Sequence, residues 1–363
     1  MNNFLKLKAL YDKDQFSDLI AENKGIRFLK IRSISRSNLI RSFAKQLGKD
    51  TTKKATELFK EIFDDNNISE NKIEKFINSI YSQNRKKRLT VEDKIYSQLY
   101  KLNVFNWGGF YQNAVEKNIV NNYIKKIWQY DKLVDAVETD ITPRLTNYVT
   151  ASWYNHWSSV LIEDIFTDHK SILPSVGLIK KVDFFWNNFP FDLKVTYFPD
   201  GFLQKERKER KLKPELSELK YFARKNQIPY DNKQKNNEIF KDLLIKIEED
   251  TSLNSKKFMK SFTNTRKKIL KETIKHPSTL IKWLYEEQGE RRFDASNRLF
   301  LVLVDKDNFE ESWKLKRNKK LLYQEINNFL NSSKNLKPEE IKLKFSWKNE
   351  VYTTYSKLHF IVK

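Results

Sequence analysis

The sequence predicts an α/β (α+β) fold, in which an all-helical N-terminal domain precedes a mixed central β-sheet flanked by helices. From Ser35 to about Lys132, apolar residues recur every three or four positions, as they do in amphipathic helices. After residue 150, short β-branched and aromatic runs alternate with helical stretches, which is typical of a mixed sheet. We therefore expect two domains, residues 1–149 and 150–363, in a chain long enough to bury a sizeable core.

The composition favours a folded protein with an anionic partner. The 363 residues include 69 lysines and arginines against 47 acidic residues, which gives a net charge of +22, and 14% of the residues are aromatic. Such an excess of positive charge is typical of proteins that bind nucleic acid. A lysine-rich and asparagine-rich sequence also arises from a biased genome, so the charge alone does not identify the partner.

Several classes of site are excluded by what the sequence lacks. The chain has no cysteine, which excludes disulfides and thiolate zinc sites, and its four histidines are scattered. It contains neither a GxxxxGK[ST] nor a GxGxxG motif, so we expect no nucleotide cofactor. We find no apolar stretch of signal-peptide or membrane-spanning length, and we expect a cytoplasmic protein with no membrane partner.

Residues 35–63 of the helical domain allow two interpretations. They are expected to form a helix, a turn at Gly48 and a second helix. In the first interpretation this is a helix-turn-helix DNA reader, with Arg36 and Arg41 facing DNA beside Arg32 and Lys45. In the second it is an ordinary helical hairpin with a solvated basic face.

The second domain is expected to alternate between strands and helices. The expected elements, in chain order, are a helix over 153–169, a turn over 174–177, strands over 177–185 and 190–198, a charged helical insertion over about 201–290, a strand over 298–305, a helix over 310–330 and a closing hairpin around Lys348 and Asn349.

Three charged residues lie within the first two of these strands. Asn187 and Asn188 suit a two-residue hairpin turn because asparagine tolerates positive φ. With that turn, Asp183 lies directly opposite Asp192, and alternation places Lys194 on the same face as Asp192.

Two such carboxylates would repel each other. At about 4 Å the repulsion amounts to roughly 4 kcal/mol at an effective dielectric of 20. A divalent cation between the carboxylates removes this cost, and hard oxygen ligands suit Mg²⁺ or Mn²⁺. The alternative is a plain salt bridge with Lys194 on a solvated face.

Asp183, followed nine positions later by Asp192-Leu193-Lys194, resembles the signature of the PD-(D/E)xK nucleases, a superfamily that includes type II restriction endonucleases. The family often has a proline before the first aspartate, where this chain has Val182. The resemblance covers roughly residues 150–363 and implies a restriction-endonuclease-like core.

The resemblance also implies a catalytic site. Asp183, Asp192 and the main-chain carbonyl of Leu193 would hold Mg²⁺, with Mn²⁺ able to substitute, while Lys194 would orient or deprotonate the attacking water. A preceding helix often supplies a further acid in this family.

Two neighbouring residues of the 153–169 helix are candidates for that further acid. Helical periodicity places Asp164 within the apolar arc and Glu163 just outside it. Since the family favours glutamate, we expect Glu163 to be both a catalytic residue and a metal ligand.

The implied activity is Mg²⁺-dependent hydrolysis of phosphodiester bonds in double-stranded DNA, in restriction or phage defence, with a homodimer as the expected assembly. One alternative is a nuclease that acts on RNA or on branched or single-stranded DNA. The other is a non-catalytic DNA-binding regulator whose carboxylates are structural.

Candidate nucleic-acid contacts lie outside the catalytic group, and each has a solvated charge or an ordinary strand residue as its alternative. In the second domain they are Thr196, Lys205, Arg207, Arg210, Lys211, Arg291, Arg292 and Arg298.

Overall fold

The computed structural model describes residues 3–110, 114–177, 179–287, 296–333, 336–347 and 349–363. Helices predominate among these residues, and six strands form one mixed sheet, so the expected mixed α/β class is confirmed. Up to residue 167 the described elements are helices, in agreement with the helical periodicity of that part of the sequence.

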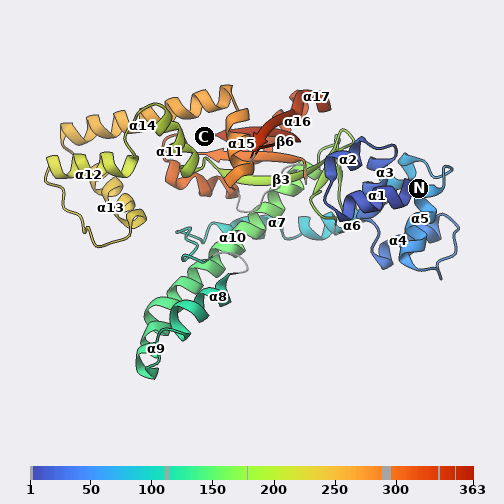
Figure 1. Cartoon of the computed structure of the whole chain (residues 1–363), viewed down its shortest axis with the longest axis horizontal. Helices are drawn as coiled ribbons and strands as arrows, with labels where there is room; N and C mark the ends of the chain where they lie inside the picture. The colour runs from blue at the N-terminus through green and yellow to red at the C-terminus, as the bar shows by residue number, and fades with distance from the viewer. Residues whose placement is uncertain (1–2, 111–113, 178, 288–295, 334–335, 348) are drawn as a thin grey trace. The chain divides into compact units, whose positions relative to one another are not determined.

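In the first half of the chain, the described residues form ten α-helices and two short π-helical segments, η1 (Val120–Ile124) and η2 (Val137–Ile141). The α-helices are α1 (Asn3–Asp12), α2 (Phe16–Ala21), α3 (Gly25–Ser33), α4 (Ser37–Gln46), α5 (Ala55–Asp64), α6 (Glu70–Leu89), α7 (Glu92–Leu99), α8 (Val115–Ile119), α9 (Tyr130–Ala136) and α10 (Thr142–Thr167). In Figure 1, α8 and α9 run alongside the N-terminal part of α10.

The second half contains the sheet and the remaining helices. The strands are β1 (Ile172–Pro174), β2 (Phe184–Trp186), β3 (Phe189–Tyr197), β4 (Arg298–Val304), β5 (Lys342–Trp347) and β6 (Glu350–Val362). The helices are α11 (Asp200–Glu209), α12 (Glu215–Lys225), α13 (Asn236–Glu249), α14 (Leu253–Lys275), α15 (Ser278–Glu287), the 3₁₀ helix η3 (Phe309–Arg317), α16 (Lys319–Ser332) and α17 (Pro338–Ile341).

The strand order in the sheet is β1-β2-β3-β4-β6-β5. The β1–β2, β2–β3 and β5–β6 pairs are antiparallel, whereas β4 and β6 are parallel. Every residue of β4 is buried, which explains why its sequence is an uninterrupted apolar run after Arg298. The strand predicted over 298–305 and the charged insertion predicted to be helical are both confirmed.

The predicted hairpin turn is also confirmed. Asn187 and Asn188 have φ values of 47° and 70° and connect β2 to β3. Positive φ at both central residues is the requirement of a type I′ turn, whose twist matches that of the flanking strands. The turn sets the register of β2 and β3, with Trp186 paired to Phe189 and Phe184 to Phe191.

The first expected strand, over 177–185, is wrong in extent. Regular pairing starts only at Phe184, because Lys181 adopts a positive φ of 64° and bends the chain away from an extended path. The ammonium of Lys181 makes an ion pair with Asp14 at 2.9 Å. The sequence also did not predict β1, which is only three residues long.

The single helix expected over 310–330 is interrupted at Asn318. The side chain of Asn318 accepts a hydrogen bond from the main-chain N–H of Leu321 at 3.2 Å and caps α16. The preceding residues form η3 instead, because an asparagine N-cap begins a new helix at the following residues. In the closing hairpin, Trp347 pairs with Glu350 and Asn349 has a φ of 67°, while Lys348 lies outside the described residues.

The chain divides into two compact units. The first unit comprises Met1–Leu193, Ala295–Asn297 and Trp313–Glu340. Residues from α1 to α6 share one hydrophobic core with Ile179, Val182 and Phe185. The expected boundary at residue 150 falls within α10, and the N-terminal helices pack against residues that follow it.

The second unit comprises Lys194–Asp294, Arg298–Ser312 and Ile341–Lys363. One of its cores joins β4 to α11, α14 and α15, and another joins α12, α13 and α14 into a helical lobe, which can be followed by its labels in Figure 1. Among the described residues of both units, no helix is long and apolar enough to cross a membrane.

Candidate active site

The candidate acids lie on two neighbouring segments, Asp183 just before β2 and Asp192 within β3. Asp183 immediately precedes β2 and is half-buried. Its carbonyl accepts a hydrogen bond from Ser175 N–H at 3.0 Å, which continues the pairing on the β1 side of the sheet. On the β3 side its N–H donates to the carbonyl of Phe191 at 2.8 Å. Asp183 is therefore held by backbone hydrogen bonds on both sides.

The carboxylate of Asp183 contacts the backbone of β3. Its Oδ2 accepts a hydrogen bond from the main-chain N–H of Leu193 at 2.7 Å. In a two-residue hairpin, hydrogen-bonded pairs recur at every second residue, so a continued ladder would have supplied the carbonyl of Val182 to this N–H. The side chain of Asp183 takes the place of that carbonyl.

This arrangement corrects the predicted register at one point. The regular β2–β3 ladder ends at the Phe184–Phe191 pair, and Asp183 bonds to Phe191 rather than pairing directly with Asp192. The reason is the bend that Lys181 introduces just before β2. The carboxylate of Asp183 nevertheless reaches the residue that follows Asp192, so the two aspartates lie on neighbouring segments.

Asp192 is the more deeply placed acid, with only 5% of its surface exposed. Its N–H donates to the carbonyl of Asn297 at 2.8 Å, and the Asn297 side chain donates to the carbonyl of Pro190 at 3.1 Å. Asn297 therefore holds β3 through two bonds on either side of Phe191. Sequence reasoning missed this residue, and its position immediately before the buried β4 strand was the signal available.

The other predicted residues of the group follow along β3. Leu193, Lys194 and Thr196 are all half-buried. Because side chains alternate along a strand, Lys194 and Asp192 belong to one face of β3 and Leu193 to the other. The hydroxyl of Thr196 donates to the carbonyl of Tyr197 at 3.4 Å, a local bond that gives no indication of a ligand contact.

Of the two helix acids, Asp164 is the one that arginines of α6 engage. Its side chain is buried and accepts hydrogen bonds from Arg88 Nη2 at 2.5 Å and Nε at 2.8 Å. It also makes an ion pair with Arg85 Nη1 at 3.4 Å. The hydrogen bond to Asp164 raises the pKa of Arg88. Asp164 is therefore committed to ion pairs with α6, which sequence reasoning did not predict.

Glu163 is half-buried on α10. Within the described part of the chain, no three or more histidine or acidic side chains gather into a group that could hold a metal ion. Glu163, Asp183 and Asp192 are all described residues, so the expected set of three carboxylate ligands does not form. The residues that are brought together are Asp183 and the Asp192-Leu193 segment.

Three of the arginines proposed as nucleic-acid contacts are engaged by other residues of the protein, and two of them are buried. Arg207 is 1% exposed and makes an ion pair with Glu218 at 2.6 Å. Arg210 makes an ion pair with Glu206 at 2.8 Å, and this hydrogen bond raises its pKa. Arg298 is 1% exposed, with its guanidinium 5.0 Å from the centre of the Tyr285 ring.

The remaining basic candidates are exposed or undescribed. Lys205 and Lys211 are exposed, and the ammonium of Lys205 lies 3.9 Å from the carboxylate of Glu209. Arg291 and Arg292 lie outside the described residues.

Of the two N-terminal candidates, Arg36 is the N-cap of α4 and Arg41 lies within that helix. Arg36 and Arg41 are both exposed. Arg41 donates to the hydroxyl of Ser37 and to the carbonyl of Thr51 at 3.3 Å. The α4–α5 hairpin therefore has a basic face, which both interpretations of residues 35–63 expect.

Searches against models of known protein families, curated proteins and solved structures found no match to this chain.

Proposed function

We propose that this protein is a Mg²⁺-dependent nuclease that hydrolyses phosphodiester bonds in double-stranded DNA. The observation that carries the proposal is the 2.7 Å hydrogen bond from Leu193 N–H to Asp183 Oδ2, which places one carboxylate beside the Asp192-Leu193-Lys194 segment. The net charge of +22 supports a polyanionic substrate. The six-stranded mixed sheet, with the candidate hairpin on its β1 side, supports a restriction-endonuclease-like core.

The donor atoms at this place suit magnesium. Asp183 and Asp192 offer carboxylate oxygens and Leu193 offers a main-chain carbonyl, and hard oxygen donors are the ligands that Mg²⁺ takes in proteins. When bound, the ion would polarise a phosphate oxygen and lower the pKa of a bound water. The N–H of Leu193 orients the Asp183 carboxylate before any ligand arrives.

Lys194 provides the positive charge. Its ammonium would stabilise the negative charge that develops on the phosphate in the transition state, and would hold the attacking water. Burial of Asp192 limits access of bulk solvent, which strengthens such electrostatic interactions. Glu163 is not needed in this scheme.

The test is cleavage of plasmid DNA in the presence of Mg²⁺ or Mn²⁺. We expect the wild-type protein to cut and the Asp192→Asn and Lys194→Ala variants to lose on the order of 100-fold or more of that activity, because each removes charge from the reacting centre. Glu249→Gln and Lys256→Ala are matched exposed controls and should cut like wild type.

Running single-stranded DNA and RNA beside the plasmid identifies the substrate. Cleavage of RNA or single strands alone would replace duplex DNA as the substrate and retain the site. If no nucleic acid is cut while Mn²⁺ also fails to bind, or if the Asp192 and Lys194 variants cut as well as wild type, the nuclease proposal is wrong.

A further inference from the structure

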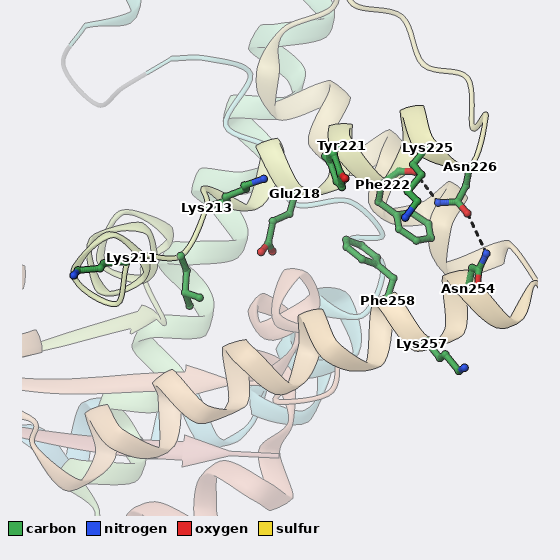
Figure 2. Close-up of a pocket in the computed structure, with 11 residues that line it drawn as sticks. Lys211, Lys213, Glu218, Tyr221, Phe222, Lys225, Asn226, Asn254, Lys257 and Phe258 are labelled. Atoms are coloured by element: carbon green, nitrogen blue, oxygen red, sulfur yellow. Dashed lines mark hydrogen bonds between the residues drawn. The ribbon is translucent and has the colours of Figure 1, made fainter.

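A second candidate site lies in the helical lobe of the second unit, between α12 and α14. It is a cavity of about 580 Å³, which lies within the size range of small-molecule pockets. Figure 2 shows the residues that line it, which come from the segment before α12, from α12 and its C-terminal end, and from α14. None of these residues belongs to the proposed nuclease centre.

Aromatic rings form one part of the lining. Phe222 of α12 and Phe258 of α14 are stacked, with ring centres 4.2 Å apart and planes at 19°. This pair joins the two helices and is partly buried against the core of the lobe. Tyr221, the neighbour of Phe222, also lines the cavity but is 56% exposed, so its ring is accessible to a ligand.

Positive charge surrounds these rings. Lys211, Lys213, Lys225 and Lys257 line the cavity, and the ammonium of Lys213 lies 4.9 Å from the centre of the Tyr221 ring. Glu218 is the only acid among the described lining residues, and it makes an ion pair with the buried Arg207 at 2.6 Å. The lining therefore carries a net positive charge beside an exposed aromatic face.

Two amides complete the lining. Asn226 Nδ2 donates to the carbonyl of Phe222 at 2.9 Å, and Asn254 Nδ2 donates to Asn226 Oδ1 at 3.4 Å. These bonds connect the C-terminal end of α12 to the start of α14 and orient polar groups at the pocket. Amides of this kind can contact the polar edge of a nucleic-acid base.

We propose that this pocket binds an unpaired nucleotide, with its base stacked on Tyr221 and its phosphate held by the lysines. Base stacking on an aromatic side chain together with phosphate neutralisation is how proteins hold single strands. A base inside a duplex is already stacked on its neighbours and does not offer its face. The nucleotide comes either from a single strand or from a free mononucleotide, which share this chemistry.

Fluorescence anisotropy with a labelled oligothymidylate at low salt tests the proposal. We expect Tyr221→Ala to weaken binding on the order of tenfold or more, and Tyr221→Trp to retain it. Tyr323→Ala removes a tyrosine of similar exposure, 60%, from α16 and should bind like wild type.

Lysine variants test the phosphate contacts. Lys225→Gln should lower the slope of log affinity against log salt by about 0.7, the value for one contact to a single strand. Lys256→Gln, an exposed lysine of α14 that does not line the cavity, should leave the slope unchanged. Thermal unfolding of each variant confirms that it is folded.

Competition identifies the source of the nucleotide. Displacement of the oligonucleotide by thymidine monophosphate at similar affinity assigns the pocket to free nucleotides, and a strong preference for the oligonucleotide assigns it to a strand. The proposal is overturned if wild type binds neither, or if Tyr221→Ala binds like Tyr323→Ala. Asp192→Asn should keep full binding, so this test stands apart from the nuclease test.

Discussion

At the scale of single residues, burial and hydrogen bonding decide which charges are available for chemistry. Asp183 and Asp164 are both aspartates next to apolar strand or helix residues, yet Asp164 is held by two arginines and Asp183 by a main-chain N–H. The sequence identified Asp183 and Asp192 as a pair from the hairpin register. It could not show that arginines of α6 would reach Asp164, because that contact depends on how α6 and α10 pack.

The hydrogen bond of Asp183 allows its structural role to be separated from its chemical role. Asp183→Ala leaves the Leu193 N–H without its acceptor and should lower the free energy of unfolding by about 1–3 kcal/mol. Asp183→Asn keeps an oxygen at the same place and should cost less than half of that. Urea denaturation measures both, with Asp131→Ala on the exposed surface of α9 as the control.

Both Asp183 variants should lose cleavage activity, since neither carries a charged carboxylate. Equal stability of Asp183→Ala and wild type would show that the bond to Leu193 contributes nothing to folding.

Because Lys316 is buried and its pKa is lowered, the free energy of unfolding should depend on pH. Lys316 is 2% exposed, and its ammonium donates to Asn155 Oδ1. Burial lowers its pKa from 10.5 to about 7. Between pH 7 and pH 10.5 the unfolded chain therefore binds a proton at Lys316 that the folded protein does not bind. The burial of Lys316 destabilises the fold fully below pH 7. This destabilisation decreases as the pH rises and is absent above the unfolded-state pKa of 10.5.

The wild-type protein should therefore gain about 2 kcal/mol of unfolding free energy between pH 7 and pH 9 relative to Lys316→Met. Denaturant unfolding at the two pH values measures this difference, and Lys320→Met, an exposed lysine of α16, is the control. Parallel pH profiles for wild type and Lys316→Met would contradict the expectation.

At the scale of elements, the structural features that depend on neighbouring residues were predictable from the sequence, and those that depend on distant contacts were not. The Asn187–Asn188 turn follows from the tolerance of asparagine for positive φ, and the buried β4 strand from its continuous apolar run. The extent of β2 was not predictable, because the bend at Lys181 accompanies an ion pair with Asp14, which lies far away in the sequence, in the turn between α1 and α2. Nor did periodicity show that Asn318 would act as a cap.

The ion pairs that join α6, α7 and α10 give a prediction at this scale. Arg85 contacts Glu92 at 2.6 Å, Asp168 at 2.8 Å and Asp164 at 3.4 Å, and its own side chain is 9% exposed. Arg85→Met leaves these acids without their shared cation and should lower the unfolding free energy by about 3–5 kcal/mol.

Thermal or urea unfolding checks this, with Lys86→Met as the control on the exposed side of the same helix. The Arg85→Met/Asp168→Asn double variant should recover part of the loss, because it removes the charge of a carboxylate that pairs with Arg85. If Arg85→Met and Lys86→Met unfold alike, the pairs join the helices without stabilising them.

At the scale of the whole molecule, net charge is a property of the sequence and its distribution is a property of the fold. A charge of +22 predicts an anionic partner, but Arg207 and Arg298, two of the cations proposed as contacts, are buried. Guanidinium groups suit internal ion pairs and stacking on rings, whereas ammonium groups are more strongly hydrated. Among the described residues, the lysines of the α12–α14 pocket are therefore better placed to meet a polyanion.

The sequence by itself determined the helical N-terminal region, the hairpin with its Asn-Asn turn, the apolar β4 strand and the proximity of Asp183 to Asp192, because each follows from local periodicity or turn geometry. Only the tertiary structure decided that Asp164 is neutralised by arginines, that the described residues Glu163, Asp183 and Asp192 do not form a three-carboxylate metal site, and that an aromatic and basic pocket forms between α12 and α14. These features depend on contacts between residues far apart in the chain, and the periodicity of a single segment carries no information about its distant neighbours.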